Sequence, residues 1–182
     1  MTLQQITLEP VAANEDNFAP FGKLIRPDES AGRGTKFYDD AVAVWDIPGM
    51  VTDEEATISV ARTYIRPLSV IWMERHFKHT QVFMPVNGQA FHLVVAPPNE
   101  KNVPDVDAVR AFTFDGNAGV MLDLGTWHEF PFAIEREADI AVFLRRETNA
   151  NLEAFENGEA IGGDLEKRNI QTRLGVEFIV AV

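Results

Sequence analysis

The chain of 182 residues contains no cysteine. Disulfides, thiolate zinc sites, iron–sulfur clusters and a cysteine nucleophile are therefore excluded. Long apolar runs are missing too, because the run from Phe91 to Pro98 is far shorter than the roughly 18 residues of a membrane-spanning helix and contains His92. Residues 1–10 include neither a basic nor an apolar region, so we expect no secretory signal and a cytoplasmic location.

Basic residues are also scarce, with 16 Lys and Arg against 28 Asp and Glu and a formal net charge of −12. Nucleic-acid binding requires a basic face that displaces counterions from phosphates, and this surface repels phosphates on balance. The same repulsion disfavours an acidic membrane surface. We therefore expect neither nucleic acid nor a membrane as partner. A small anionic substrate is compatible with this charge, because one arginine can outweigh the distant net charge locally.

Length and composition are those of one globular domain. Domains average roughly 150 residues, and a chain with 46% hydrophobic and 24% charged residues is typical of a folded globular protein. We therefore expect a single domain over residues 1–182.

Most apolar residues fall in short runs separated by Pro, Gly, Asn and Asp, a pattern typical of β-strands. Asn87-Gly88 predicts a hairpin, because type I′ turns need positive φ at both central residues, and Asp115-Gly116-Asn117 predicts a second tight turn. Many short strands without alternating helices favour a sandwich or a barrel, and the missing phosphate-loop motifs exclude Rossmann and P-loop enzymes. The predicted strands are residues 57–66, 68–74, 81–85, 90–96, 108–114, 119–123, 130–134 and 140–145.

Helix is expected only towards the two ends of the chain. Residues 14–21 can form one helical turn capped by Asn14, with acidic residues next to the positive helix end. A short helix is expected at 150–157, followed by a loop at 158–164. The last apolar run, from Val176 to Val182, is expected to pair with a sheet or with a second subunit, because an exposed apolar strand promotes aggregation.

Three of the four histidines lie within residues 76–92, and the fourth is His128. Alternate side chains of a strand share a face, so Glu74 and His76 are expected to point the same way and Arg75 the opposite way. An imidazole among aliphatic residues is costly to bury unless its polar atoms have partners. The histidines are therefore the first candidates for chemistry in this chain.

The spacing of these residues resembles the two motifs of the cupin superfamily. Glu74 stands at the position of the first motif histidine, His76 at the second, Gln81 at the acid and Gly88 at the closing glycine. The second motif has a counterpart in DLGTWH at residues 123–128, which keeps the glycine and the histidine without the proline. A set of Glu, His, Gln and His can bind an Mn- or Zn-like ion through oxygen and imidazole.

A longer pattern is similar to the ureidoglycolate lyase family, formerly called ureidoglycolate hydrolases. The matching residues are FAPFG at 18–22, Arg62, ERH at 74–76, TQxFxPxxG at 80–88, VRAF at 109–112 and GTWH at 125–128. The chain departs from the family beside the last motif, where it carries Asp123 and Glu129. The resemblance implies an all-β, cupin-type β-barrel (a double-stranded β-helix), here with short terminal helices, that forms a homodimer. It also implies an enzyme of purine and allantoin catabolism that splits ureidoglycolate into glyoxylate and urea.

This reaction requires removal of a hydroxyl proton and protonation of the departing nitrogen, which is general acid–base chemistry. His76 and His128 are the predicted base and acid, or the ligands of a metal, and the sequence does not decide between these roles. Glu74 is expected to orient an imidazole or to bind a metal, and Gln81 to contact the amide groups of the substrate. The sequence requires no cofactor and leaves room for a divalent metal, whose ligands would be Glu74, His76, Gln81 and His128.

An arginine is expected to hold the substrate carboxylate, because the guanidinium fork matches two carboxylate oxygens. The candidates are Arg62, favoured by the family match, and Arg75, which is expected on the opposite face. His92 is either a ligand contact inside the barrel or a satisfied core residue, and Tyr38 is a further candidate for ligand contact. His79 is expected to be an exposed turn residue.

Two alternative functions stay open at this point. One is a metal-dependent cupin enzyme of another reaction, such as an isomerase or a dioxygenase. The other is a cupin that binds a small molecule without catalysis.

Overall fold

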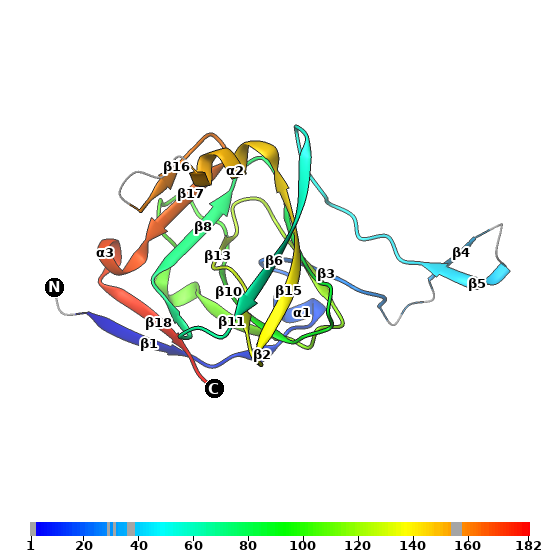
Figure 1. The fold of residues 1–182 in the computed structure, drawn as a ribbon, viewed down its shortest axis with the longest axis horizontal. Coiled ribbons are helices and arrows are strands. Elements are labelled where there is room, and N and C mark those ends of the chain that lie inside the picture. The colour runs from blue at the N-terminus through cyan, green and yellow to red at the C-terminus, as the bar shows by residue number, and fades with distance from the viewer. Residues whose placement is uncertain (1–2, 29, 31, 36–38, 154–157) are drawn as a thin grey trace.

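The computed structural model describes residues 3–28, 30, 32–35, 39–153 and 158–182. Strands dominate this part of the chain (Figure 1), and its helices are few and short. The helices are α1 (Glu15–Phe18), the 3₁₀ helix η1 (Val106–Ala108), α2 (Arg146–Glu153) and α3 (Ile170–Leu174). The prediction of a mostly β fold with short helices is therefore confirmed.

One of the two large sheets has five strands, and its longest pairing joins β15 to β6 over nine residues of each strand. Its strands in spatial order are β3 (Gly22–Ile25), β12 (Gly119–Leu122), β9 (Gln81–Pro85), β15 (Glu137–Arg145) and β6 (Ala56–Tyr64).

The other large sheet has eight strands, and it carries the histidines at positions 76, 92 and 128. Its strands in spatial order are β16 (Ala160–Ile161), β17 (Leu165–Asn169), β8 (Trp72–His76), β13 (Trp127–His128), β10 (Phe91–Ala96), β11 (Arg110–Phe114) and β2 (Val11–Ala12), with β14 (Phe132–Ala133) paired to β10. Over the described residues no strand pairing joins this sheet to the five-stranded one.

Two smaller sheets complete the fold. The first contains both ends of the chain, since β1 (Gln4–Leu8) pairs in parallel with β18 (Val176–Val180), which also pairs with β7 (Ser69–Val70). The second is the hairpin of β4 (Arg33–Thr35) and β5 (Asp39–Val44), which stands away from the body of the molecule in Figure 1.

Strand β10 explains how the layers are held together, because both of its faces are buried. Phe91, Leu93 and Val95 pack with residues of the five-stranded sheet in one apolar cluster. Val94 and Ala96 point the other way and pack against the small terminal sheet in a second cluster. The eight-stranded sheet therefore lies between two cores, and its face toward the five-stranded sheet is the inner face of the fold.

Helix α1 closes the inner core at one end. The side chain of Asn14 accepts hydrogen bonds from the backbone of Asp16 and Asn17, and the Asn17 side chain accepts one in return, which makes a capping box. The turn places Phe18 in edge-on contact with Phe112, at a ring distance of 5.1 Å. The predicted helical turn with Asn14 as its cap is therefore confirmed.

The two predicted turns have different outcomes. Asp115-Gly116-Asn117 is a tight turn, in which the Asn117 N–H donates to Asp115 Oδ1 and Gly116 has a φ of +88°. Asn87-Gly88 is also a turn, with a Gly88 φ of +70°. The predicted hairpin is nevertheless wrong, because β9 and β10 on either side of it belong to different sheets. Glycine is required at position 116, since a Cβ there would lie 2.2 Å from the Gly88 carbonyl oxygen.

Near the C-terminus the predictions are partly confirmed. Residues 176–180 form β18 and pair within a sheet, as expected for an apolar terminal run. The helix expected at 150–157 begins earlier, at Arg146, and residues 154–157 lie outside the described part of the chain. The loop predicted at 158–164 contains the short strand β16, which pairs with β17 directly after it, and the polar sequence of β17 gave no strand signal. No helix among the described residues is long and apolar enough to cross a membrane.

Phe18 provides a test of the inner core, because it is fully buried against the rings of Phe112 and Phe114. Phe18→Ala should lower the free energy of unfolding by about 3–5 kcal/mol, since the lost apolar contacts leave a cavity. Urea unfolding followed by circular dichroism measures this change. Ile58→Ala is the control, because Ile58 is 66% exposed and its loss should cost less than about 0.5 kcal/mol. Equal effects of the two substitutions would contradict the assignment of this core.

Candidate active site

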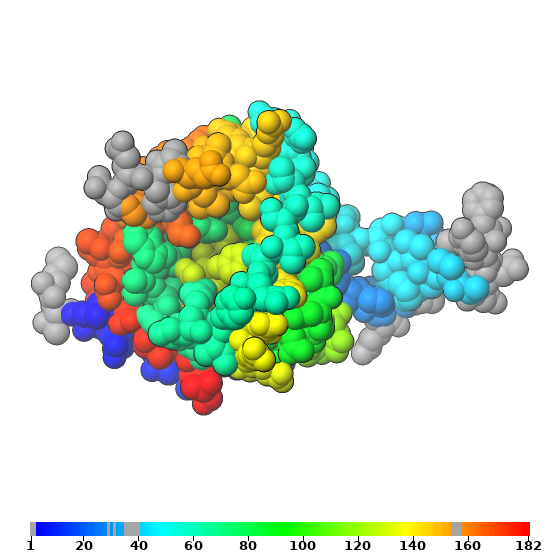
Figure 2. Space-filling view, viewed as in Figure 1, coloured from blue at the N-terminus to red at the C-terminus, as the bar shows by residue number. Residues whose placement is uncertain are grey.

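Three neighbouring strands of the eight-stranded sheet bring polar residues into one row on the inner face. Glu74 of β8 lies opposite His128 of β13 on one side and opposite Lys167 of β17 on the other. His76 follows on the same face of β8, two residues after Glu74. In Figure 2 the molecule is hollowed between β8 and β6, and the atoms at the bottom of the hollow have the yellow-green colour of β13 and the residues that follow it.

Glu74 is a buried carboxylate held by two partners. Lys167 Nζ donates a hydrogen bond to Glu74 Oε2 at 2.9 Å, and His128 Nε2 lies 3.6 Å from Glu74 Oε1. Burial alone would raise the pKa of Glu74, but the contact with His128 and the charge of Lys167 outweigh burial and hold this pKa well below its usual range. The charge of Glu74 raises the pKa of Lys167 in turn, against the effect of burial. The site therefore contains a buried ion pair at neutral pH.

His128 faces an oxygen at each of its two ring nitrogens. Nδ1 lies 3.0 Å from the carbonyl oxygen of Thr126, and Nε2 faces Glu74 Oε1. The Thr126 carbonyl can only accept, so Nδ1 is the donor in its contact, while Nε2 has no hydrogen-bond partner among the described residues. The ring of Phe83 packs edge-on against His128 at 5.9 Å and fixes its plane.

His76 has the opposite surroundings. Its ring lies between the rings of His128, at 5.2 Å, and His79, at 4.5 Å. Neither ring nitrogen of His76 has a hydrogen-bond partner in the described part of the chain. Burial, with the charge of His128 as the next cause, lowers the pKa of His76 from 6.5 to about 3. His76 is therefore neutral at physiological pH, with a free lone pair.

At its solvent end the row of polar residues continues with Arg66, which follows β6, and Glu129, which follows β13. Arg66 Nη2 donates to Glu129 Oε1 at 3.1 Å and to the carbonyl oxygen of Phe130 at 2.8 Å. Burial raises the pKa of Glu129, although the nearby charges of Arg66 and Lys167 oppose this effect. Arg66 and Lys167 keep part of their side chains exposed. They are cations within reach of a ligand, and the sequence pattern did not single out either of them.

Gln81 also faces the interior. It lies on the same face of β9 as Phe83, and its Oε1 is buried without a partner among the described residues. Buried polar atoms are normally hydrogen-bonded. The unpaired Oε1 of Gln81 is therefore free to accept a hydrogen bond from a ligand.

The residues predicted as metal ligands fit a divalent ion in part. One ligand atom from each of Glu74, His76 and His128 lies within 4.8 Å of the others, and all three residues are buried. A carboxylate with two imidazoles suits Zn²⁺ or a similar transition metal. The unpaired nitrogens of His76 and Nε2 of His128 agree with this fit. No hydrogen bond joins Gln81, the fourth predicted ligand, to these three residues.

The structure does not bring Arg62 or Arg75 to this row. Arg62 is half exposed on β6, where its guanidinium donates to both carboxylate oxygens of Asp139. Arg75 points from β8 into the opposite face, as strand alternation predicts, and is buried there. It donates to Glu166 Oε2 at 2.8 Å and lies over the ring of Trp127. Both guanidinium groups are occupied by structural partners.

His92 and Tyr38 are likewise outside the row. His92 shares the outer face of β10 with Val94 and Ala96, and its Nδ1 lies 3.0 Å from the hydroxyl of Thr113. Of the two readings of His92, the structure therefore supports the satisfied core residue. Tyr38 lies outside the described residues.

The expectation that His79 is an exposed turn residue is wrong. His79 is only 3% exposed, and its Nδ1 lies 2.8 Å from Asp164 Oδ2. The buried carboxylate of Asp164 holds the ring in place, although Asp164 is 85 residues away from His79 in the chain. Spacing within the first motif gave no signal for such a contact.

The low pKa of His76 has a measurable consequence for stability. The unfolded chain binds a proton at His76 near pH 6.5, whereas the folded chain does so only near pH 3. Between these values the unfolded state binds more protons, so the free energy of unfolding falls as the pH falls. From about pH 7 to about pH 5, His76 should account for a loss of about 2 kcal/mol.

Urea unfolding in the presence of a chelator, at several pH values, measures this slope. The His76→Asn variant should lack this part of the slope, because it has no imidazole to protonate. A variant with the same slope as the unchanged protein would show that His76 is not held neutral by the fold.

Comparison with known proteins places the chain among relatives of one kind. The family model described as ureidoglycolate lyase matches residues 4–162. A ureidoglycolate lyase of Pseudomonas syringae pv. tomato is 31% identical over 169 residues, which cover 87% of this chain and 95% of the relative. Ureidoglycolate lyases of Pseudomonas fluorescens Pf0-1 and Azotobacter vinelandii are 33% and 30% identical over 79% and 85% of this chain, and 86% and 93% of their own lengths. The chain therefore belongs to the ureidoglycolate lyase family.

Proposed function

We propose that this protein is a ureidoglycolate lyase, a carbon–nitrogen lyase that releases glyoxylate and urea. The observation that carries the proposal is the convergence of His76 and His128, at a ring distance of 5.2 Å, beside Glu74 and Lys167 on one inner sheet face. Membership of the family supplies the substrate, and the geometry supplies the groups that its cleavage requires.

The substrate carbon bears a hydroxyl, a carboxylate and a ureido nitrogen. Cleavage moves the hydroxyl proton to a base, turns the C–O bond into the aldehyde double bond, and breaks the C–N bond. The departing nitrogen takes a proton from an acid, so that urea leaves neutral. One base and one acid on the two sides of the same carbon therefore complete the reaction without any other reactant.

The surroundings of the two imidazoles assign these roles. His76 is neutral and has an unpaired nitrogen, so it can take the hydroxyl proton. His128 lies beside the Glu74 carboxylate and across from His76, and we assign it as the acid that gives the proton to the departing nitrogen. Opposite surroundings of two titratable groups are the usual mark of an acid and base pair.

The carboxylate of the substrate is held by Lys167 and Arg66 rather than by Arg62 or Arg75. Both side chains are partly exposed at the end of the row, and their positive charges reach the same acidic residue, Glu129. Fixed cations next to an otherwise acidic surface bind a small anion locally. Gln81, with its unpaired Oε1, is placed to accept a hydrogen bond from the amide end of the substrate.

A divalent ion would be held by Glu74, His76 and His128. When bound, such an ion polarises the oxygens of a hydroxy acid and lowers the pKa of its hydroxyl. Lys167 and Arg66 would bind the carboxylate in either case, and Phe83 would keep the His128 ring in its plane. Metal analysis of protein purified without chelator decides whether the ion is present.

The finer features of the fold belong to the same proposal. The shared inner core of the two large sheets supports one cupin-type barrel and a single domain over residues 1–182. The β4–β5 hairpin, which stands away from the body and exposes Val42 of β5, supports a homodimer. The place of the family in purine and allantoin breakdown supports a cytoplasmic enzyme.

The roles of the histidines are tested by substitution. His76→Ala and His128→Ala should each lower kcat for release of glyoxylate and urea by at least about 10²-fold, because acid–base catalysis is lost. Glyoxylate is measured by a coupled reduction and urea by urease, and circular dichroism checks the fold. His92→Ala is the matched control, since His92 lies on the outer face of β10 and should leave kcat unchanged. Near-normal rates in both site variants would refute the assignment.

The carboxylate site is tested by a pair of arginine substitutions. Arg66→Met should raise KM about 10-fold, because a hydrogen bond to a charged group is lost. Arg62→Met should leave KM unchanged, because Arg62 binds Asp139 on the outer face. Steady-state kinetics with ureidoglycolate give both values. If only Arg62→Met raised KM, the substrate carboxylate would be assigned to Arg62, as the sequence predicted.

A further inference from the structure

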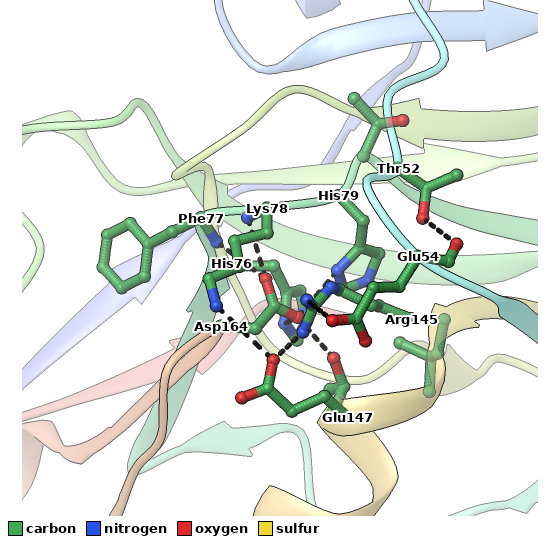
Figure 3. Close-up of polar contacts among 12 residues, drawn as sticks. Thr52, Glu54, His76, Phe77, Lys78, His79, Arg145, Glu147 and Asp164 are labelled. Carbon is green, nitrogen blue, oxygen red and sulfur yellow. Dashed lines mark hydrogen bonds and ion pairs between the residues drawn. The ribbon is translucent and has the colours of Figure 1, made fainter.

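A second buried carboxylate, that of Asp164, lies beside His76 and His79 (Figure 3). Asp164, just before β17, is fully buried. Its Oδ1 accepts hydrogen bonds from the backbone N–H groups of Lys78, at 2.8 Å, and Phe77, at 3.2 Å. Its Oδ2 accepts one from the hydroxyl of Thr148 and lies 2.8 Å from His79 Nδ1. The proposed acid–base pair makes no use of this carboxylate.

The bonds to Asp164 keep it ionised. Burial would raise its pKa, but the contacts with His79 and Thr148 outweigh burial and lower it. A fixed negative charge inside the fold is therefore aimed at the two imidazoles of the first motif.

Both imidazoles respond to this charge through Nδ1. His79 Nδ1 lies 2.8 Å from Asp164 Oδ2, and a carboxylate at this separation favours the tautomer with the proton on Nδ1. His76 Nδ1 lies 3.9 Å from the same oxygen, and the His79 ring packs against the His76 ring at 4.5 Å. The other groups that face His76 are Glu74 of its own strand and His128 of β13. Asp164 therefore favours the form of His76 with its proton on Nδ1 and its lone pair on Nε2.

We propose that Asp164 and His79 are positioning residues for His76, which fix the plane of its ring and select the tautomer whose Nε2 accepts the substrate proton. The inference rests on the proposed function for its role in turnover, while the tautomer is a property of the folded protein alone. A carboxylate that orients a catalytic imidazole by its far nitrogen is a known solution in hydrolytic enzymes. Here the carboxylate acts on the base directly and through a second imidazole.

The elements around the pair are tied together, as positioning requires. Arg145, at the end of β15, is buried and pairs with Glu54, at 2.8 Å, and with Glu147 of α2. This cation fixes the start of α2, which carries Thr148, to the segment before β6. The backbone of Thr52 in that segment forms a bridge with His79. The partners of Asp164 thus belong to one rigid cluster.

A metal ion is the competing explanation of this cluster, because one ligand atom each from His76, His79 and Asp164 lies within 4.8 Å of the others. Both oxygens of Asp164 already accept hydrogen bonds from the protein, from the backbone N–H groups of Phe77 and Lys78 and from the Thr148 hydroxyl, and Oδ2 also lies in direct contact with His79 Nδ1 at 2.8 Å. The direct contact therefore favours the positioning role.

The first experiment compares Asp164→Asn with the unchanged protein in steady-state kinetics. Asparagine keeps an oxygen for the two backbone N–H groups and turns its amide N–H toward the Thr148 hydroxyl, which can accept in place of donating, while the charge is removed. We expect kcat to fall about 10²-fold while KM changes less than about twofold, because Asp164 orients the base and does not touch the substrate. Lys78→Met is the matched control, since it removes a neighbouring surface charge and leaves the backbone N–H to Asp164 in place. An unchanged kcat, or a rise in KM alone, would overturn the proposal.

The second experiment observes the imidazoles directly and does not depend on turnover. Proton–nitrogen spectra of the four histidine rings should show His79 and His76 with the proton on Nδ1 in the unchanged protein, and a mixture of tautomers for His76 in Asp164→Asn. His76 with its proton on Nε2 in the unchanged protein would overturn the proposal. If the unchanged protein does not cleave ureidoglycolate, the proposed function fails, and these spectra still decide the positioning role.

Two further variants separate loss of positioning from loss of folding. If Asp164→Asn does not fold, His79→Phe replaces it, since phenylalanine keeps the ring bulk and removes the contact with Asp164; it should lower kcat without raising KM. If Asp164→Asn and His79→Phe both fold, the variant that combines them should have nearly the same kcat as the less active of the two single variants, because the pair acts as a unit. Additive losses, or a bound metal that is lost with Asp164→Asn, would contradict the proposal.

Discussion

The site depends on one constraint, which is that Glu74 is a charge inside a protein core. Removing a carboxylate from water costs several kcal/mol unless partners replace the water. Lys167 and His128 are those partners, and they come from the strands on either side of β8. The register of three antiparallel strands therefore fixes which groups meet, and a slip of one residue would turn all of them to the other face. Catalytic geometry and strand register are the same constraint here.

The opposite face of β8 makes this register rigid. Arg75 donates to Glu166 of β17 and to the backbone carbonyls of Asn99 and Lys101, and its guanidinium stacks over Trp127 of β13. These contacts reach the same two neighbouring strands that carry Lys167 and His128. Arg75, a candidate substrate ligand in the sequence, thus links β8 to its two neighbouring strands behind the site. The inner face of β8 carries the site residues, and its outer face carries the contacts that hold the strands together.

Much of this was accessible from the sequence, and the remainder has physical reasons. Continuous apolar runs such as 91–96 reveal strands buried on both faces, and Asn14 reveals its helix because capping is local. Strand β17 was missed because its sequence, LEKRN, is polar, and its charges are buried only by partners far away in the chain. Asp164, Lys167 and Arg66 were not predicted as site residues for the same reason, since their partners are also far away in the chain. Alternation correctly separated Arg75 from His76, but a single sequence does not tell which acid occupies Arg62.

Arg62 has a different consequence for the molecule. Strand β6 is nine residues long, lies at the edge of its sheet over the described residues, and exposes Ile58 and Val60. A long apolar edge of this kind is a template on which another chain can add a strand and begin an insoluble assembly. The charges of Arg62 and its partner Asp139 interrupt that template near the C-terminal end of β6. This ion pair thereby acts as a gatekeeper, a charged interruption that opposes the addition of a further strand at this edge.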